Sequence, residues 1–359
     1  MEQPQSALRT LWPKAFNTEA TERLGSGTAR PHILNAMKQK VFITRPVGDE
    51  AIQMLSARYD VACNTRDVRP TPEEMAENLR DTDGLMLAGA RLTAEVLAQA
   101  PKLRAVSNVG VGYDNIDLPA CTARKIPVTS AVGVVEEATA DLAFGLLLAA
   151  ARRLAEADRY VRDGQWQSWQ WKLLWGTDVH NKTLGIFGFG HIGQAMARRA
   201  RGFSMRVIYH SRHRVPEAIE RELGASYVDR DALLSQSDFL SLHVPLTSAT
   251  RHLMGAAEFA RMRPSAFLVN TARGPIVDEE ALVAALEKGQ IKGAALDVFE
   301  QEPHVHPKLL TLPNVALAPH IGSATAETRA AMARFAAQNL LDLLDGKRPA
   351  TLLNPQVFE

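Results

Sequence analysis

The segment from Gly185 to Gly193, with the sequence GIFGFGHIG, most constrains what this chain can fold into. It overlaps the apolar run Thr183–Phe187, which we expect to be a buried strand, and precedes an alanine-rich helix expected from Gln194 to Arg201. Between strand and helix, such glycines allow a tight turn, and the free N–H groups of the helix bind phosphate. The pattern predicts a dinucleotide site, with a glycine-rich structural turn as the alternative. Its pyrophosphate would lie at Gly188, Gly190, His191, Ile192 and Gly193.

The next expected strand, Met205–Tyr209, leads into the basic segment His210–Arg214. An acidic residue about 20 positions beyond the glycines would bind the 2′-hydroxyl of NAD, but this segment contains no acid. Ser211, Arg212 and Arg214 instead offer hydrogen-bond donors suited to a phosphate. We therefore expect NADP as the preferred cofactor, with NAD possible. A solvated basic loop is the alternative.

Length and composition limit the classes of protein to consider. With 359 residues the chain is long enough for two domains, and its net charge of +1 does not favour binding to nucleic acid or to a membrane surface. The longest near-continuous apolar run, Leu142–Ala151, is too short to cross a bilayer. Cys63 and Cys121 are far apart in the sequence, which excludes a cysteine-built metal site and indicates a reducing compartment. We expect a cytoplasmic protein without a metal.

Strand and helix patterns alternate along two blocks of the chain, which predicts two parallel sheets covered by helices. In the first block we expect helices Asp49–Ala57 and Thr71–Arg80, and strands Val41–Thr44, Gly84–Leu87, Ala105–Asn108 and Val128–Ser130. Residues Glu136 to Arg162 are predicted to form one long helix. The strands of the second block are expected at Leu184–Phe187, Val207–Tyr209, Phe239–His243, Ala266–Asn270, Gly293–Val298 and Val315–Ala318.

This alternation predicts an α/β protein with two Rossmann-like domains. Residues 1–36 lack the apolar segment of a secretory signal and are interpreted as an N-terminal extension. Residues 37–138 and 323–359 would form a flavodoxin-like substrate domain, on which the helix expected at Ala324–Leu344 packs. Residues 139–322 would form an inserted dinucleotide-binding domain of six to seven parallel strands. The active site is expected in the cleft between the domains.

Three chemically distinctive residues follow successive strands of the second block, where open α/β sheets carry their chemistry. Arg273 can hold both the carboxylate and the carbonyl of a 2-oxo acid. His320 can supply a proton near neutral pH, and Glu302 can orient it. Taken singly, Arg273 could be a helix-end charge, His320 a buried histidine and Glu302 a solvated acid. Their combination after a dinucleotide turn favours catalysis.

Five motifs lie in order along the chain: Val109–Asp117, the glycine turn, Asn270–Gly274, Asp297–Pro303 and Pro319-His320. Together they resemble the D-isomer-specific 2-hydroxyacid dehydrogenases, and among them the NADPH-preferring glyoxylate/hydroxypyruvate reductases of the 2-ketogluconate reductase type. The resemblance covers nearly everything from about Lys40 onward. It implies NADPH-dependent reduction of a small 2-oxo acid (glyoxylate, hydroxypyruvate or 2-ketogluconate) to the D-2-hydroxy acid. A dinucleotide-sensing binding protein of the corepressor type is the alternative.

The resemblance also implies roles for individual residues. Arg273, Glu302 and His320 would be the catalytic residues, with His320 as proton donor. The substrate would be bound by Arg273, His320 and the backbone N–H groups near Val111 and Gly112. The remaining cofactor contacts would come from Val244, Pro245, Thr250, Thr271 and Asp297. A homodimer would form through the cofactor domain, with the tryptophan-rich stretch Trp166–Trp175 at the position of the dimer arm.

Overall fold

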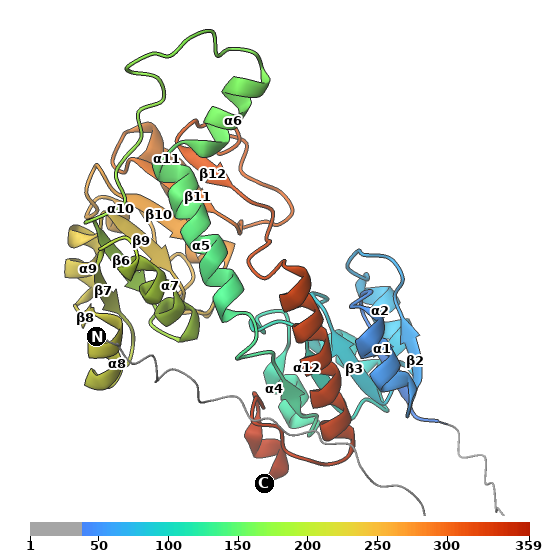
Figure 1. Ribbon diagram of the computed structural model, residues 1–359. Helices are drawn as coiled ribbons and strands as arrows, with labels where there is room; N and C mark the ends of the chain where they lie inside the picture. The colour runs from blue at the N-terminus through green and yellow to red at the C-terminus, as the bar shows by residue number, and fades with distance from the viewer. Residues whose placement is uncertain (1–37) are drawn as a thin grey trace, which may run out of the picture. The chain divides into compact units, whose positions relative to one another are not determined.

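The computed structural model describes residues 38–359. The predicted extension at residues 1–36 lies outside the described residues. Residues 38–359 contain two parallel sheets, one of five strands and one of seven (Figure 1). The predicted fold class, with two parallel α/β domains, is confirmed. The domain boundaries proposed from the sequence remain predictions.

The five-stranded sheet is built from the first part of the chain and has the strand order β2-β1-β3-β4-β5, which is the flavodoxin-like order. Alternate side chains of β1 point to opposite faces, so that Val41 and Ile43 pack beneath α1 while Phe42 packs beneath α2 to α4. The strands are β1 (Lys40–Ile43), β2 (Asp60–Cys63), β3 (Gly84–Leu87), β4 (Ala105–Asn108) and β5 (Val128–Thr129). The helices are α1 (Asp49–Ser56), α2 (Pro72–Leu79), α3 (Ala94–Ala98) and α4 (Leu118–Ala123).

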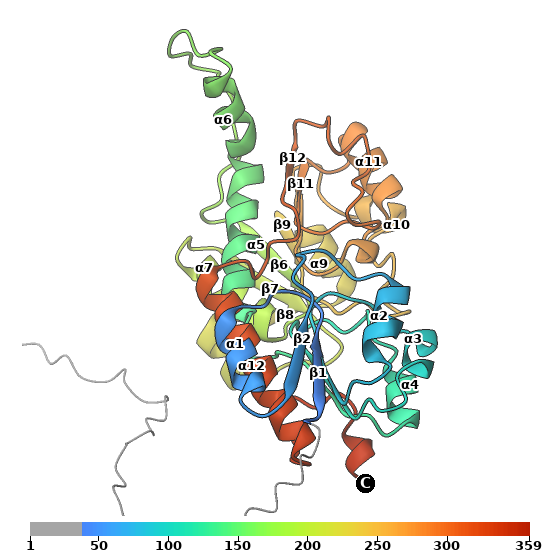
Figure 2. The same cartoon turned by 90° about the vertical axis from the view of Figure 1, so that its right-hand side faces the viewer.

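The end of the chain returns to this first sheet. Helix α12 (Ala326–Leu344) lies beside α1 and packs on β3 and β4 (Figure 2), as the sequence predicted. Beyond it, Asn354 is fully buried, and its side-chain oxygen accepts a hydrogen bond from the backbone N–H of Val128 at 2.9 Å. A final turn, η2 (Pro355–Phe358), follows. The first sheet is therefore completed by residues from both ends of the described chain.

The seven-stranded sheet has the order β12-β11-β10-β9-β6-β7-β8. Counted from β6, this is the Rossmann order with one further strand at the end. Its strands are β6 (Thr183–Phe187), β7 (Arg206–His210), β8 (Ala225–Tyr227), β9 (Phe239–Leu242), β10 (Phe267–Asn270), β11 (Gly293–Leu296) and β12 (Val315–Leu317).

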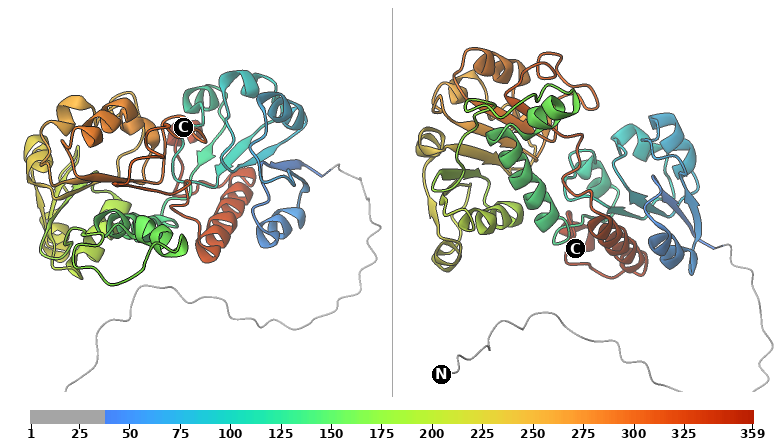
Figure 3. Two further views of the ribbon diagram at one scale, coloured as in Figure 1. Left: turned by 90° about the horizontal axis from the view of Figure 1, so that it is seen from above. Right: turned by 45° about the horizontal axis from the view of Figure 1, so that its top comes forward.

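Helices cover both faces of this sheet (Figure 3). One face packs against α5 (Glu136–Ala151), α7 (His191–Arg201) and α8 (Glu217–Leu223). The other packs against α9 (Arg230–Gln236), α10 (Ala256–Phe259) and α11 (Glu279–Glu287), which follows the short turn η1 (Gly274–Ile276). Since the central strands β6, β9, β10 and β11 are buried on both faces, they appear in the sequence as mostly apolar runs.

The prediction of a single helix from Glu136 to Arg162 is wrong. The structure has two helices, α5 and α6 (Leu154–Arg162), separated at Arg153, which has a left-handed φ of 56°. The carbonyl oxygen of Ala151 accepts a hydrogen bond from the N–H of Thr177 at 2.7 Å instead of continuing the helix. Gly176 lies so close that a Cβ atom there would be 2.6 Å from the same oxygen. A segment distant along the chain therefore helps to end α5.

The sequence prediction also missed two edge strands and shortened one helix. Strand β2 alternates between exposed and half-buried residues, and β8 has three residues of which only one is buried, so neither carries a strong apolar pattern. Helix α7 begins at His191 rather than Gln194, directly after the glycine turn. Within residues 38–359, no helix is long and apolar enough to cross a membrane.

Candidate active site

The glycine turn between β6 and α7 has the geometry of a phosphate-binding turn. Gly188 has a φ of 92°, and a Cβ atom there would lie 2.6 Å from the carbonyl oxygen of His243. A Cβ on Gly193 would lie 2.3 Å from the carbonyl oxygen of Gly188, whereas a Cβ on Gly190 would meet nothing within 4 Å. Two of the glycines are thus required by packing, and the third leaves the turn open to a ligand.

The start of α7 is also available to a ligand. Gly190 is its N-cap, and among residues 38–359 no side chain caps the helix. His191 is exposed and Ile192 is half-buried, so the first turn of the helix lies at the surface of the protein. Uncapped N–H groups and the positive end of the helix dipole suit a pyrophosphate. These residues therefore fit a dinucleotide.

The residues of the basic segment after β7, His210–Arg214, differ in whether their side chains are already hydrogen-bonded. Arg214 donates two hydrogen bonds to the buried carboxylate of Glu220, at 2.9 and 2.7 Å. Hydrogen bonds from Arg214 and from the Tyr209 hydroxyl lower the pKa of Glu220 to about 2. Ser211 donates to the carbonyl oxygen of His213 at 2.6 Å. Arg212 is exposed and makes no side-chain hydrogen bond with the residues that the structure describes.

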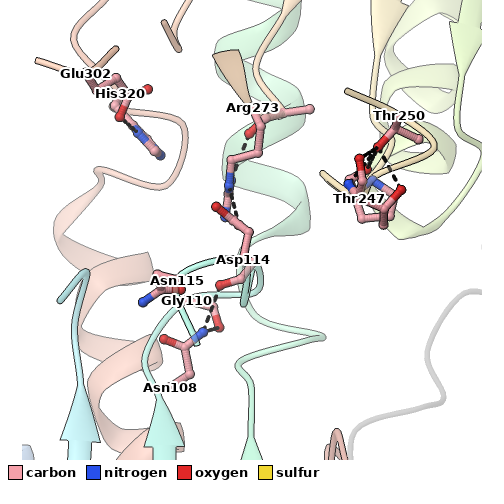
Figure 4. Close-up of polar contacts among 12 residues, drawn as sticks. Asn108, Gly110, Asp114, Asn115, Thr247, Thr250, Arg273, Glu302 and His320 are labelled. Atoms are coloured by element: carbon pink, nitrogen blue, oxygen red, sulfur yellow. Dashed lines mark hydrogen bonds and ion pairs between the residues drawn. The ribbon is translucent and has the colours of Figure 1, made fainter. Parts of the chain in front are cut away.

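Two loops at the carboxyl ends of β9 and β10 carry four of the five remaining predicted cofactor contacts: Val244, Pro245, Thr250 and Thr271. Thr271 is 8% exposed, and its hydroxyl oxygen is buried without a hydrogen-bond partner among the described residues. This orphaned group is consistent with a ligand contact. Thr250 donates instead to the carbonyl oxygen of Pro245 at 2.6 Å, which shapes its own loop (Figure 4). Val244, just before that proline, packs beside Gly188.

His320 and Glu302 form a hydrogen-bonded pair, with Nδ1 of the imidazole 2.8 Å from Oε2 of the carboxylate (Figure 4). Burial alone would raise the pKa of Glu302, but the hydrogen bond and charge of His320, with a smaller contribution from Arg273, lower it below its usual value. The second carboxylate oxygen of Glu302 accepts from the N–H of Phe299 at 3.1 Å. The ionised carboxylate therefore fixes the imidazole and leaves Nε2 for a substrate.

Asp297 holds the turn that carries His320. Its two carboxylate oxygens accept hydrogen bonds from the N–H groups of Ile321 and Gly322, at 2.7 and 2.8 Å. Its carbonyl oxygen accepts from the N–H of His320 at 2.7 Å. Burial raises the pKa of Asp297 despite these bonds. The sequence suggested only a cofactor contact for Asp297, and its support of the histidine turn is visible only in the structure.

Arg273 reaches from the second sheet to a loop of the first. Its Nε atom donates to Oδ1 of Asp114 at 2.8 Å, and Nη1 donates to the carbonyl oxygen of Ala272, also at 2.8 Å. Its guanidinium fills the space beside Gly112, because a Cβ on that glycine would lie 1.5 Å from Nη2. The structure thus brings together Arg273 and Gly112, two of the predicted substrate contacts.

The loop after β4 presents its backbone to this guanidinium. The buried side chain of Asn108 donates to the carbonyl oxygens of Gly110 and Gly112, both at 2.9 Å (Figure 4). These bonds hold Val111 and Gly112 half-exposed at the end of the strand. Neither Asn108 nor Asp114 was predicted as a site residue. Asp114 lies within the Val109–Asp117 motif, and this position in the motif is the only sequence feature that points to a role for it.

The comparison with known proteins follows from this geometry. The sequence profile of the D-isomer specific 2-hydroxyacid dehydrogenase NAD binding domain matches residues 144–322. The glyoxylate reductase of Thermococcus litoralis is 49% identical over 327 residues, which cover 90% of this chain and 98% of the relative. The chain belongs to the D-isomer-specific 2-hydroxyacid dehydrogenase family. It is therefore an NAD(P)-dependent oxidoreductase, as the motifs predicted.

Two solved structures of reductases are similar to the dehydrogenase in sequence and in fold. A glyoxylate reductase from Paecilomyes thermophila is 35% identical with a TM-score of 0.81, over 89% of this chain and 99% of that one. An NADPH-dependent glyoxylate/hydroxypyruvate reductase from Sinorhizobium meliloti, in complex with NADP and malonate, is 33% identical with a TM-score of 0.79, over 89% and 98%. Both similarities extend over the two sheets of the dehydrogenase.

Proposed function

We propose that this dehydrogenase reduces small 2-oxo acids to 2-hydroxy acids, of D configuration where C2 becomes a stereocentre. Glyoxylate, which gives achiral glycolate, is the first candidate, and hydroxypyruvate and 2-ketogluconate are further candidates. The observation that carries the proposal is the His320–Glu302 pair at the carboxyl edge of the sheet that also carries Arg273. These residues supply a proton donor, its orienting carboxylate and a cation, which are the groups that reduction of a 2-oxo acid requires. The relatives named as glyoxylate reductases support the same substrate class.

Each side chain has a defined part in the reaction. Arg273 and the N–H groups of the Val111–Gly112 loop bind the substrate carboxylate, and Arg273 also polarises the carbonyl. When bound, a reduced nicotinamide cofactor supplies the hydride. His320 gives the proton on Nε2 to the carbonyl oxygen as that oxygen gains negative charge, and Glu302 stabilises the imidazolium before the transfer.

The cofactor proposal is NADPH in preference to NADH. Exposed Arg212 and the hydroxyl of Ser211 lie after β7, where no acid is present to bind a 2′-hydroxyl. Arg214 is engaged by Glu220 through Nε and Nη2, so we assign the principal phosphate contact to Arg212 and a supporting role to Arg214. Gly188, Gly190, His191, Ile192 and Gly193 would hold the pyrophosphate.

We further propose a homodimer, formed through α6 and the segment 163–178 after it, which project from the end of α5 (Figures 1 and 2). Exposed apolar side chains concentrate there, and such patches are typical of protein interfaces. They are Leu154, Val161, Trp166, Trp169, Trp171 and Trp175. A Trp169→Ser, Trp171→Ser double variant should sediment as a monomer while the wild type sediments as a dimer. A monomeric wild type would contradict this proposal.

The compartment proposed is the cytoplasm. Both cysteines are free, with Cys121 buried and Cys63 half-buried, which suits a reducing environment. The near-neutral net charge of +1 gives no reason to expect nucleic acid as a partner.

The proposed function is tested by steady-state assays of the purified enzyme with glyoxylate, hydroxypyruvate and 2-ketogluconate, each with NADPH and with NADH. His320→Ala should lower kcat about 10²- to 10⁴-fold, whereas NADPH binding, followed by fluorescence, should be retained. Wild-type turnover by His320→Ala would exclude this residue as the proton donor. NADPH binding without turnover of any 2-oxo acid would instead favour a dinucleotide-sensing protein.

A further inference from the structure

The guanidinium of Arg273 is constrained at two of its three nitrogen atoms. Nε donates to Asp114 and Nη1 donates to the carbonyl oxygen of Ala272, each at 2.8 Å. The third nitrogen, Nη2, lies against the Cα atom of Gly112, where even a methyl group could not fit. Nε has a single N–H, which is used on Asp114, whereas Nη1 keeps one N–H and Nη2 keeps two. The substrate therefore meets the end of the guanidinium formed by Nη1 and Nη2.

Asp114 comes from the other sheet and is held firmly. It lies 159 residues before Arg273 in the sequence, in the loop between β4 and α4. Two bonds anchor the loop just after Asp114. The side-chain amide of Asn115 donates to the carbonyl oxygen of Ala90 at 2.5 Å, and the backbone N–H of Asp117 donates to the carbonyl oxygen of Leu92 at 2.8 Å. The loop that carries Asp114 is thus anchored to the segment after β3, which limits where the carboxylate can lie.

The side chains of this ion pair are partly shielded from solvent. The side chain of Asp114 is 31% exposed and that of Arg273 is 28% exposed. An arginine side chain has many rotamers, and holding it in one of them during each turnover requires contacts that remain when the substrate leaves. Ala272 lies next to Arg273 in the chain, so its carbonyl can follow the arginine as it moves, whereas Asp114 is an independent anchor.

The negative charge of Asp114 has a second effect. A carboxylate beside Arg273 partly neutralises the cation that the substrate carboxylate must bind, so it weakens substrate binding. Because its charge opposes substrate binding, this acceptor is expected to act on the orientation of Arg273 rather than on substrate affinity. The two effects can be separated, because orientation depends on the hydrogen bond and affinity depends on the charge.

We propose that Asp114 is a positioning residue that fixes the Nε edge of Arg273 and presents the Nη1/Nη2 end to the substrate. The inference rests on the proposed function, since it assigns Arg273 to the 2-oxo acid. It predicts that kcat depends on a hydrogen-bond acceptor at position 114, whereas the KM for the 2-oxo acid depends on the negative charge at that position.

The test compares Asp114→Ala and Asp114→Asn with the wild type, using glyoxylate and saturating NADPH. Asp114→Ala should lower kcat about ten- to hundredfold, as expected for a misoriented substrate contact. Asp114→Asn keeps an oxygen that can accept from Nε, so it should retain most of the wild-type kcat and show a lower KM for glyoxylate. The KM for NADPH should stay at the wild-type value in both variants.

Coupling to Arg273 is tested in a double-mutant cycle. If Asp114 acts through the guanidinium, Asp114→Ala should have no further effect on kcat/KM in an Arg273→Ala background. Glu50→Ala is the matched control, because Glu50 forms an ion pair with Arg334 at 3.0 Å between α1 and α12, remote from the site. This control should keep wild-type kinetics. Melting temperatures establish that each variant is folded.

Three results would overturn the positioning role: wild-type kcat in Asp114→Ala, additive losses in the cycle, or a higher kcat/KM in Asp114→Ala. The last would make Asp114 a competitor of the substrate. If Asp114→Ala does not fold, Asp114→Glu is tested in its place, because it keeps the negative charge but displaces the acceptor oxygen. A wild-type kcat in Asp114→Glu would overturn the positioning role. If the wild type reduces no 2-oxo acid, the proposed function itself fails, and this inference fails with it.

Discussion

His320 and Glu302 are joined by a 2.8 Å hydrogen bond between Nδ1 and Oε2, although they lie 18 residues apart on the segments flanking β12. The histidine has a left-handed φ of 55°, and Asp297 holds the turn around it through hydrogen bonds to the neighbouring N–H groups. The pair is therefore fixed from two sides before a substrate arrives. Such preorganisation is what a proton donor requires.

Replacing Glu302 with Gln tests the electrostatic part of this pair. The amide oxygen can still accept from Nδ1, but the charge that favours the imidazolium is lost. We expect Glu302→Gln to lower kcat for 2-oxo acid reduction about tenfold, because no carboxylate then stabilises the imidazolium that donates the proton. The measurement is steady-state kcat with glyoxylate and NADPH. Glu280→Gln is the control, since Glu280 lies 3.0 Å from His306 in a similar pair outside the site; wild-type kcat in Glu302→Gln would contradict the assignment.

Alanine variants of the glycine turn should separate folding from cofactor binding. Gly193→Ala places a methyl group 2.3 Å from a backbone oxygen, so we expect a loss of about 1–3 kcal/mol in the free energy of unfolding. Gly190→Ala meets nothing within 4 Å and should change that free energy by less than about 0.5 kcal/mol. Yet Gly190→Ala should weaken NADPH binding, because its methyl group enters the open side of the turn. Chemical denaturation and cofactor titration measure the two effects.

Cofactor preference should depend more on Arg212 than on Arg214. Arg212→Ala is expected to raise the KM for NADPH while the KM for NADH holds or falls, because a 2′-phosphate loses its cation. Arg214→Ala should raise the KM for NADPH less than Arg212→Ala does. It should also lower the melting temperature, because the buried Glu220 carboxylate loses its arginine partner. An equal loss for both cofactors in the Arg212→Ala, Arg214→Ala double variant would exclude the 2′-phosphate role.

The Glu220 pair also predicts how stability depends on pH. Glu220 has a pKa of about 2, below the usual 4.5, because Arg214 and Tyr209 hydrogen-bond to its ionised form. Since the pKa is lower in the folded state, the ionised group stabilises the fold above about pH 5, and this contribution is lost as the pH falls toward 2. Wild type should exceed Glu220→Gln in unfolding free energy at neutral pH, and the difference should shrink in acid. A difference independent of pH would contradict this prediction.

The sequence by itself determined the elements whose signals are local. The glycine turn, the apolar strands buried on both faces and the residues at their carboxyl ends predicted the two parallel sheets and the positions of Arg273, Glu302 and His320. Such signals lie within a few residues of the feature that they specify, because strand period and turn geometry are properties of short segments.

Only the tertiary structure decided features that depend on how whole elements pack against one another. Helix α5 ends at Ala151 because the segment around Thr177 takes its last carbonyl oxygen. Arg214, which the sequence offered to a phosphate, is held by Glu220 once α8 folds back on β7. Arg273 finds Asp114 across 159 residues. Hydrogen bonds of this kind follow from the packing of whole elements, and no local pattern in the sequence specifies them.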